Sequence, residues 1–274
     1  MKSLALAAWL LAALAHVTNA IYADQAGELD WSVENLGRVT AVAYGGGDKA
    51  RGSTRSTFVA TDGRSRAVAR LDSKSGAIKW RHVFAQGDDI NAIKLTNYGL
   101  LTISSGGKYV RMWDATEGGL VWDNVAHHDT TFASSGHTIL IGDDRAVVIS
   151  PNSASFVSLK DGVVNWKASL PFALDKIDSI VLSSDSSVVY ILGHASSRIA
   201  LVSIDVTTGK TTSTNPAVDG ELVTLRSSAT GEAALISVSS NKITAQSLES
   251  KAEVTSWESP ETGSRAVFVK SNLT

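Results

Sequence analysis

The sequence predicts an all-β protein, a β-propeller of four-stranded antiparallel blades. Three observations point to this fold. A short Asp-x-x-x-Gly-x-x-x-Trp unit recurs, its tryptophan positions follow a period of about 45 residues, and the intervening segments read as short strands separated by turns. After the first twenty residues no long segment has the 3.6-residue apolar period of a helix, so we expect few helices.

Composition excludes several classes of function. The chain has 274 residues, 25 Lys+Arg against 27 Asp+Glu, a formal net charge of -2 and no cysteine. Without a basic field, nucleic acid is not an expected partner. The missing cysteines exclude disulfides, thiolate zinc sites and thiol nucleophiles.

The first twenty residues are predicted to be a signal peptide. Lys2 precedes an apolar run over residues 4–15, and the small residues at 18–20 suggest cleavage after Ala20. The alternative is an N-terminal membrane anchor, but a spanning helix needs about 20 apolar residues. We therefore divide the chain into a signal peptide, residues 1–20, and a partial propeller, residues 21–274. Asn272 begins a glycosylation sequon near the C-terminus.

The repeat is clearest in two copies, residues 71–80 and 113–122. A third copy, residues 159–166, is interpreted as two residues shorter before its glycine, and a fourth copy, residues 204–209, has Ser213 in the tryptophan position. The tryptophan-equivalent positions are then Trp31, Trp80, Trp122, Trp166, Ser213 and Trp257. Spacing of about 45 residues with strand-like content is typical of propeller blades.

Three successive units each predict three or four strands. The predicted strands are residues 90–95, 100–104, 109–113 and 120–122, then 138–141, 146–149, 156–159 and 163–166, then 177–182, 188–192 and 199–204 with a weaker last strand. Four antiparallel strands in about 45 residues make one propeller blade.

The motif has a structural explanation. The aspartate at the entrance of the turn can accept backbone N–H groups, and the glycine supplies the positive φ that closes the hairpin. The tryptophan, four residues later on the outer strand, can pack against the neighbouring blade while its N–H finds a carbonyl oxygen. We interpret these tryptophans as contacts between blades rather than as a binding platform.

The chain length predicts the number of blades. The 254 residues after the signal peptide, divided by about 45, give about five to six blades with a remainder. We therefore expect an incomplete propeller with an exposed edge strand, in which residues 27–31 lack the blade that they would complete. Such a protein is expected to be poorly soluble or oligomeric.

The repeat resembles that of pyrroloquinoline-quinone-type propellers, and three stretches resemble one family more closely. These are residues 21–31 (IYADQAGELDW), 71–83 (LDSKSGAIKWRHV) and 110–122 (VRMWDATEGGLVW). They are similar to the N-terminal luminal propeller of the subunit 1 family of the endoplasmic reticulum membrane protein complex.

The resemblance implies a non-enzymatic scaffold in the lumen of the endoplasmic reticulum, without a cofactor. Its implied partners are the other subunits of the complex and client membrane proteins, because the complex supports insertion and folding of tail-anchored and multi-pass proteins. Family proteins are several times longer and carry a transmembrane helix, so membrane association is expected only through parts outside this chain. Two alternatives stay open: a quinone-dependent oxidoreductase and a luminal stress-sensor domain.

Candidate chemical sites are few, and none is assigned as catalytic, cofactor-binding or metal-binding. Asp88-Asp89 and Asp143-Asp144 could chelate Ca²⁺, but we expect solvated turns. His127-His128-Asp129 is the best metal candidate, although loop histidines without a metal are the preferred interpretation. His82 is placed at a strand end and His137 and His194 in turns, none with a paired nucleophile. Residues 45–55 are interpreted as an exposed loop, since Gly45-Gly46-Gly47 lacks the ending of a phosphate-binding loop.

Overall fold

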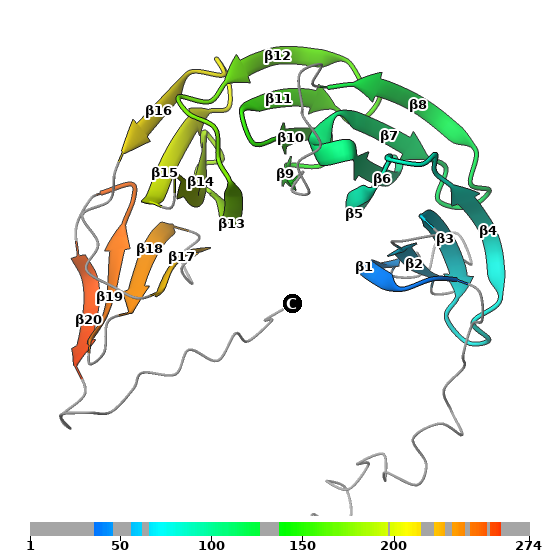
Figure 1. The fold of residues 1–274 in the computed structure, drawn as a ribbon, viewed down its shortest axis with the longest axis horizontal. Coiled ribbons are helices and arrows are strands. Elements are labelled where there is room, and N and C mark those ends of the chain that lie inside the picture. Colours follow the sequence, from blue (N-terminus) through cyan, green and yellow to red (C-terminus); the bar gives the residue numbers. More distant parts are fainter. Residues whose placement is uncertain are drawn as a thin grey trace, which may run out of the picture.

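The computed structural model describes residues 36–45, 56–61, 66–126, 137–196, 198–214, 222–227, 232–238, 242–250 and 253–258. Within these ranges twenty strands form five four-stranded sheets, each built from consecutive strands. Figure 1 shows the sheets side by side in an open arc, with the first strand of each sheet on the inside and the fourth on the outside. This is the architecture of an incomplete propeller, as predicted.

The strands follow the chain in sheet order. The first sheet contains β1 (Val39–Gly45), β2 (Ser56–Thr61), β3 (Ala67–Asp72) and β4 (Ile78–Val83), and the second β5 (Ile90–Thr96), β6 (Gly99–Ser104), β7 (Tyr109–Trp113) and β8 (Leu120–Val125). The third contains β9 (His137–Ile141), β10 (Arg145–Ile149), β11 (Ser153–Ser158) and β12 (Val164–Ser169). The fourth contains β13 (Lys176–Leu182), β14 (Val188–Ala195), β15 (Arg198–Asp205) and β16 (Thr211–Thr214), and the fifth β17 (Leu222–Ser227), β18 (Ala233–Val238), β19 (Lys242–Ser247) and β20 (Glu253–Glu258).

The predicted strands of the second, third and fourth sheets are confirmed within a few residues at each end. Within the described ranges helical structure is limited to one 3-10 turn, η3 (Ser105–Gly107), at the connection between β6 and β7. Gly45 is the last residue of β1 rather than the first residue of a loop, and residues 46–55 lie outside the described residues.

The hydrophobic core lies between sheets. One cluster joins the first and second sheets through residues such as Phe58, Trp80 and Leu100, and another joins the second and third through Leu101 and Val148. A larger cluster joins the third sheet to the fourth, and a smaller one joins the fourth sheet to the fifth. Because sheets cover both of its faces, all six residues of β6 are buried. Each sheet is therefore stabilised by its neighbours in the arc.

Candidate functional site

The turn between the third and fourth strands of each sheet contains the repeated motif. In the first sheet Asp72 Oδ1 accepts the backbone N–H groups of Lys74 and Ser75 at 3.0 and 3.1 Å. In the second, Asp114 Oδ1 accepts those of Thr116 and Glu117, both at 2.7 Å. The backbone N–H of Ser75, followed by that of Lys74, lowers the pKa of Asp72. The predicted role of the aspartate at the turn entrance is confirmed.

The glycine of the turn contacts the tryptophan of the preceding sheet. Gly118, Gly162 and Gly209 have φ values of 76°, 74° and 71°. A Cβ atom at these positions would lie 2.6 Å from Trp80 Cγ, 2.7 Å from Trp122 Cε3 and 2.8 Å from Trp166 Cδ2, respectively. The glycine is thus required both by the backbone conformation and by the approaching ring, and only the first requirement was predicted from the motif.

The indole N–H groups complete these contacts. Trp80 Nε1 donates to Ala115 O at 3.3 Å, Trp122 Nε1 to Leu159 O at 3.1 Å and Trp166 Nε1 to Val206 O at 2.8 Å. Each acceptor lies three residues before the glycine that the same ring covers. The interpretation of these tryptophans as contacts between blades is confirmed. We call this arrangement the Trp–Gly contact.

Two details of the predicted repeat are wrong. The third turn has the same length as the others, because Gly162 N bonds to Ser158 O as Gly118 N bonds to Asp114 O. Ser158 therefore stands in the place of the aspartate. The predicted repeat had instead matched Asp161 to the aspartate of the other copies.

In the fifth sheet the side chain of Ser247 accepts the N–H groups of Glu249 and Ser250, so Ser247 is the first turn residue there. The tryptophan position, eight residues after the first turn residue, is then Thr255 rather than Trp257, which pairs with Ile243.

A second polar link accompanies two of the Trp–Gly contacts. His82 Nε2 lies 2.5 Å from Gly118 O, so this nitrogen donates a proton, and Asn124 Nδ2 donates to Gly162 O at 2.6 Å. Both residues lie two positions after the tryptophan of their strand. The His82 ring also stacks on Trp113 at a centroid distance of 4.4 Å. His82 thus joins the first sheet to the second.

The contact between the fourth and fifth sheets is built differently. Ser213 stands in the tryptophan position, and Glu249 of the fifth sheet instead accepts the N–H of Ser184 at 2.9 Å and its hydroxyl at 2.6 Å. The same carboxylate accepts the N–H of Ala233 at 3.0 Å. Hydrogen bonds from Ser184, then that from Ala233, lower the pKa of Glu249. A carboxylate of the fifth sheet therefore links the two sheets at this boundary, where the tryptophan position holds a serine.

The predicted acidic pairs have different environments. Asp88 is 8% exposed and bonds to Arg111 Nη2 at 2.8 Å and to Ser105 Oγ at 2.9 Å, so its interpretation as part of a solvated turn is wrong. Asp89 forms an ion pair with Arg66 at 2.6 Å. The exposed Asp144 contacts the neighbouring Arg145 at 3.2 Å. The first pair thus serves as a structural ion-pair site.

The histidines are distributed over several sheets. His137 begins β9 and His194 lies in β14, so neither is in a turn as predicted. His194 Nε2 lies 3.1 Å from Asp178 Oδ2, and Lys176 Nζ lies 2.5 Å from Asp178 Oδ1. Burial lowers the pKa of His137, opposed by the charge of Asp178. In the described part of the chain no three His, Cys, Asp or Glu residues are grouped to hold a metal ion.

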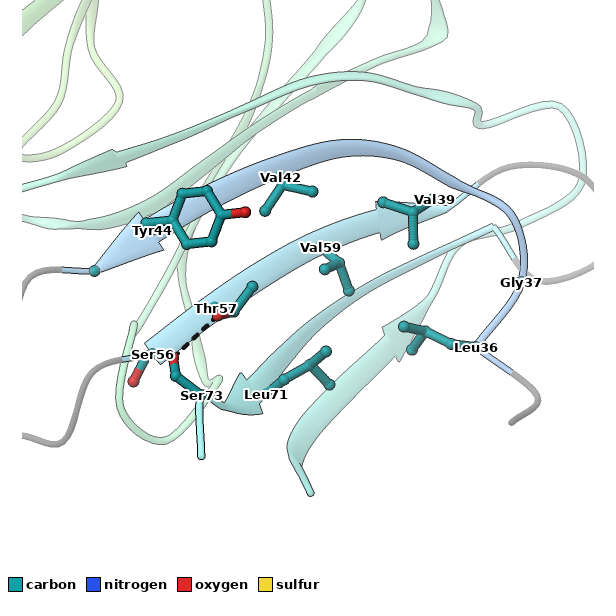
Figure 2. A pocket seen from close by; sticks show the side chains of 11 residues that line it. Leu36, Gly37, Val39, Val42, Tyr44, Ser56, Thr57, Val59, Leu71 and Ser73 are labelled. Atoms are coloured by element: carbon teal, nitrogen blue, oxygen red, sulfur yellow. Dashed lines mark hydrogen bonds between the residues drawn. The ribbon is translucent and has the colours of Figure 1, made fainter. Parts of the chain in front are cut away.

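A pocket of about 570 Å³ lies on the face of the first sheet opposite to the second sheet. Figure 2 shows Leu36, Val59 and Leu71 near one another on this face, and Val42 and Tyr44 on the edge strand β1. Leu36 is buried against Val59 and Leu71, whereas Val42 is 43% and Tyr44 77% exposed. This surface was not predicted from the sequence, although alanines alternate with larger residues along 41–44.

Several predicted features lie outside the described residues. These are the signal peptide over residues 1–20, Trp31 with Gly27, His127-His128-Asp129, the loop over residues 46–55 and the Asn272 sequon. For Trp257 the structure describes the strand but not the side chain. Across the described ranges, no helix has the length and apolar content needed to cross a membrane.

The stacked four-stranded sheets and the repeated Trp–Gly contacts define a β-propeller protein. Its blades carry the Asp-x-x-x-Gly-x-x-x-Trp repeat that was predicted from the sequence. A family model described as EMC1 N-terminal beta-propeller domain matches residues 20–265, and this chain belongs to that family.

Curated relatives agree. ER membrane protein complex subunit 1 of Gallus gallus is 28% identical over 212 residues, covering 75% of this chain and 20% of the relative. The protein of the same name from Xenopus laevis is 31% identical over 169 residues, covering 59% of this chain and 16% of the relative. The chain thus spans about a fifth or less of the length of these relatives.

Among solved structures, BamB from Moraxella catarrhalis is similar, with a TM-score of 0.52 and 15% identity over 74% of this chain and 61% of that one. At this identity the likeness shows the fold alone.

Proposed function

We propose that this chain is a luminal, non-enzymatic part of a subunit of the endoplasmic reticulum membrane protein complex. Its work in that complex is to hold other subunits and client proteins while tail-anchored and multi-pass membrane proteins insert and fold. The observation that carries the proposal is the match of the EMC1 N-terminal beta-propeller family over residues 20–265. The expected signal peptide over residues 1–20 supports delivery to the lumen.

The geometry supports a scaffold. Successive sheets are joined by buried apolar clusters and by side chains that bond to the backbone of the next sheet, as Trp122 does to Leu159. Such a stack presents its turns and edges at defined positions, as a surface for binding large partners requires. Two of the polar side chains in the described part of the chain stabilise the fold, since Asp88 is bonded to Arg111 and His82 to the backbone of Gly118.

The function is tested by insertion of a tail-anchored reporter into endoplasmic reticulum membranes from cells of the source organism. Depletion of the gene product is expected to reduce insertion, and re-expression of the intact gene to restore it. Unchanged insertion after full depletion contradicts the proposal.

The oxidoreductase alternative is tested on purified protein supplied with pyrroloquinoline quinone, Ca²⁺ and an electron-accepting dye. The scaffold proposal expects no turnover above that of heat-denatured protein. Dye reduction that saturates with an alcohol or sugar substrate would instead support the quinoprotein alternative. A cytosolic kinase domain encoded downstream in the same gene would support the stress-sensor alternative.

A further inference from the structure

The outer strands of neighbouring sheets are linked by side chains that donate to a backbone carbonyl. Lys167 Nζ of the third sheet donates to Val125 O of the second at 3.2 Å, and Thr211 Oγ1 of the fourth sheet donates to Ser169 O of the third at 3.3 Å. Both acceptors lie three residues after the tryptophan of their own strand. At two successive boundaries, a carbonyl of the outer strand is thus satisfied by a donor from the next sheet.

The boundary between the first and second sheets does not have this link. The equivalent acceptor is Val83 O, three residues after the tryptophan of β4. Asp123 stands in the position of Lys167, and Leu120 stands in that of Thr211. An aspartate and a leucine side chain cannot donate the bond. Within the described ranges no other side chain donates to Val83 O.

Asp123 and Leu120 lie on the side of β8 that faces the first sheet. Asp123 pairs with Arg111 and Leu120 with Trp113, and directly opposite residues of an antiparallel pair share a face. The Arg111 guanidinium lies 5.0 Å from the ring centroid of Phe84, which follows β4, and the Trp113 ring lies 5.9 Å from it. Asp123 is exposed, and Leu120 is 51% exposed. The outer edge of this boundary therefore presents a carboxylate and an apolar side chain to solvent.

The charge of this edge is negative. Asp123 has no hydrogen bond or ion pair with any residue that the structure describes. Its cross-strand neighbour Arg111 binds Asp88 at 2.8 Å, so that arginine is already neutralised. The other charged residues of β8 and its turn are Asp114 and Glu117, and both are exposed acids. A cation is the group that these charges would attract.

A pocket of about 500 Å³ gives such a group room. It is lined by Arg111 and Asp123 on one side of β8 and by Val164 and Lys167 on the other. On the second side, Lys167 already occupies the edge, with its Nζ on Val125 O. The molecule thus shows how a lysine fits the outer edge of one boundary, and it leaves the preceding boundary without one.

We propose that the edge between the first and second sheets binds a lysine or arginine side chain of a partner protein. The cation donates to the Asp123 carboxylate and to Val83 O, and its methylene stem and an apolar neighbour cover Leu120. The contact repeats that of Lys167 with Val125 O, with the donor supplied by another molecule. This inference is independent of the proposed function.

The surface is tested by photo-crosslinking of the full-length gene product in membranes of its own cells. The photoreactive amino acid p-benzoylphenylalanine replaces Val121, which is exposed beside Leu120. Crosslinking is expected to a partner segment in which a Lys or Arg is flanked by apolar residues. Asp123→Lys should lower the yield about 10-fold, because it opposes like charges. Replacement of the partner's cation by glutamate should restore the yield with Asp123→Lys.

Glu117→Lys is the matched control. It makes the same change of charge at another exposed position of the second sheet and should leave the yield unchanged. An equal loss with Glu117→Lys, no recovery on charge reversal, or a captured segment without a cation overturns the proposal. Crosslinks only within the chain or to a second copy, or no crosslink, overturn it as well.

Thermal unfolding of Asp123→Lys gives a second test. The new lysine can donate to Val83 O as Lys167 does to Val125 O, so the melting temperature should equal or exceed that of the wild type. A lower melting temperature would show that the two boundaries are not equivalent and would overturn the proposal.

Discussion

At the residue scale, one contact explains why both glycine and tryptophan recur. The ring of Trp80 occupies the space in which a side chain at position 118 would lie, and its N–H satisfies a carbonyl of the same turn. The tryptophan side chain buries a large ring and also donates one hydrogen bond, as is common for tryptophan in protein interfaces. Neither residue can change alone without loss of the contact.

Replacement of Gly118 by alanine tests this coupling. The positive φ of 76° costs an alanine about 1–2 kcal/mol. The clash with Trp80, at 2.6 Å, adds about 1–3 kcal/mol. We expect a loss of about 2–5 kcal/mol in the free energy of unfolding, measured by urea titration.

The neighbouring Gly119 provides the matched control. A Cβ atom at Gly119 meets nothing within 4 Å, and its φ is not in the left-handed region. Gly119→Ala should therefore change the free energy of unfolding by no more than about 0.5 kcal/mol. Equal effects of the two substitutions would show that the tryptophan contact does not constrain this turn.

Asp185 gives a second test at this scale. Hydrogen bonds from the side chain of Ser183, then from Ser187, lower its pKa from 3.8 to about 2. Because the folded pKa is depressed, the stabilisation is present in full above the unfolded pKa and is lost as pH falls through the folded one. The difference in unfolding free energy between wild type and Asp185→Asn should be constant above pH ~5 and should shrink between pH ~4 and ~2. A difference that does not vary with pH contradicts this assignment.

At the element scale, the fifth sheet is attached differently from the others. Its boundary with the fourth sheet has Ser213 in the tryptophan position and the carboxylate of Glu249 as a bridge. The apolar cluster there includes Leu192, Leu201, Leu225 and Leu235, and is smaller than the one between the third and fourth sheets. We therefore expect the fifth sheet to open more readily than the second and third.

Hydrogen exchange on Glu249→Ala tests this expectation. Loss of bonds to Ser184 and Ala233 should speed amide exchange in β17–β20 by about 3- to 10-fold, as expected for loss of hydrogen bonds worth roughly 1 kcal/mol. Exchange in β5–β12 should not change. Glu117→Ala, an exposed glutamate in the turn of the second sheet, is the control. Faster exchange throughout the molecule would show that the sheets do not open separately.

At the scale of the whole molecule, the sequence predicted what is local and repeated. Strands, turn residues and Trp–Gly spacing recur about every 45 residues, so each copy supports the others. The copy at Ser158 was misaligned because a serine replaces the aspartate, and Thr255 was missed because Trp257 lies two residues away.

Contacts without a repeat were not predictable. Ser184 and Glu249 are 65 residues apart, and no periodic signal links them. Asp88 and Arg111 likewise meet only because adjacent loops and strands of the second sheet fold together. The residues of the apolar face of the first sheet come from separate strands, β1 to β3. They can be recognised as one surface only when the arrangement of these strands is known.

We infer that the chain is part of a subunit of the endoplasmic reticulum membrane protein complex. The most direct measurement is affinity purification of the tagged, full-length gene product from detergent-solubilised membranes of its own cells, with bound proteins quantified by mass spectrometry. The claim predicts that the other subunits of the complex are recovered in near-equal amounts. Recovery of the gene product free of these subunits would contradict it.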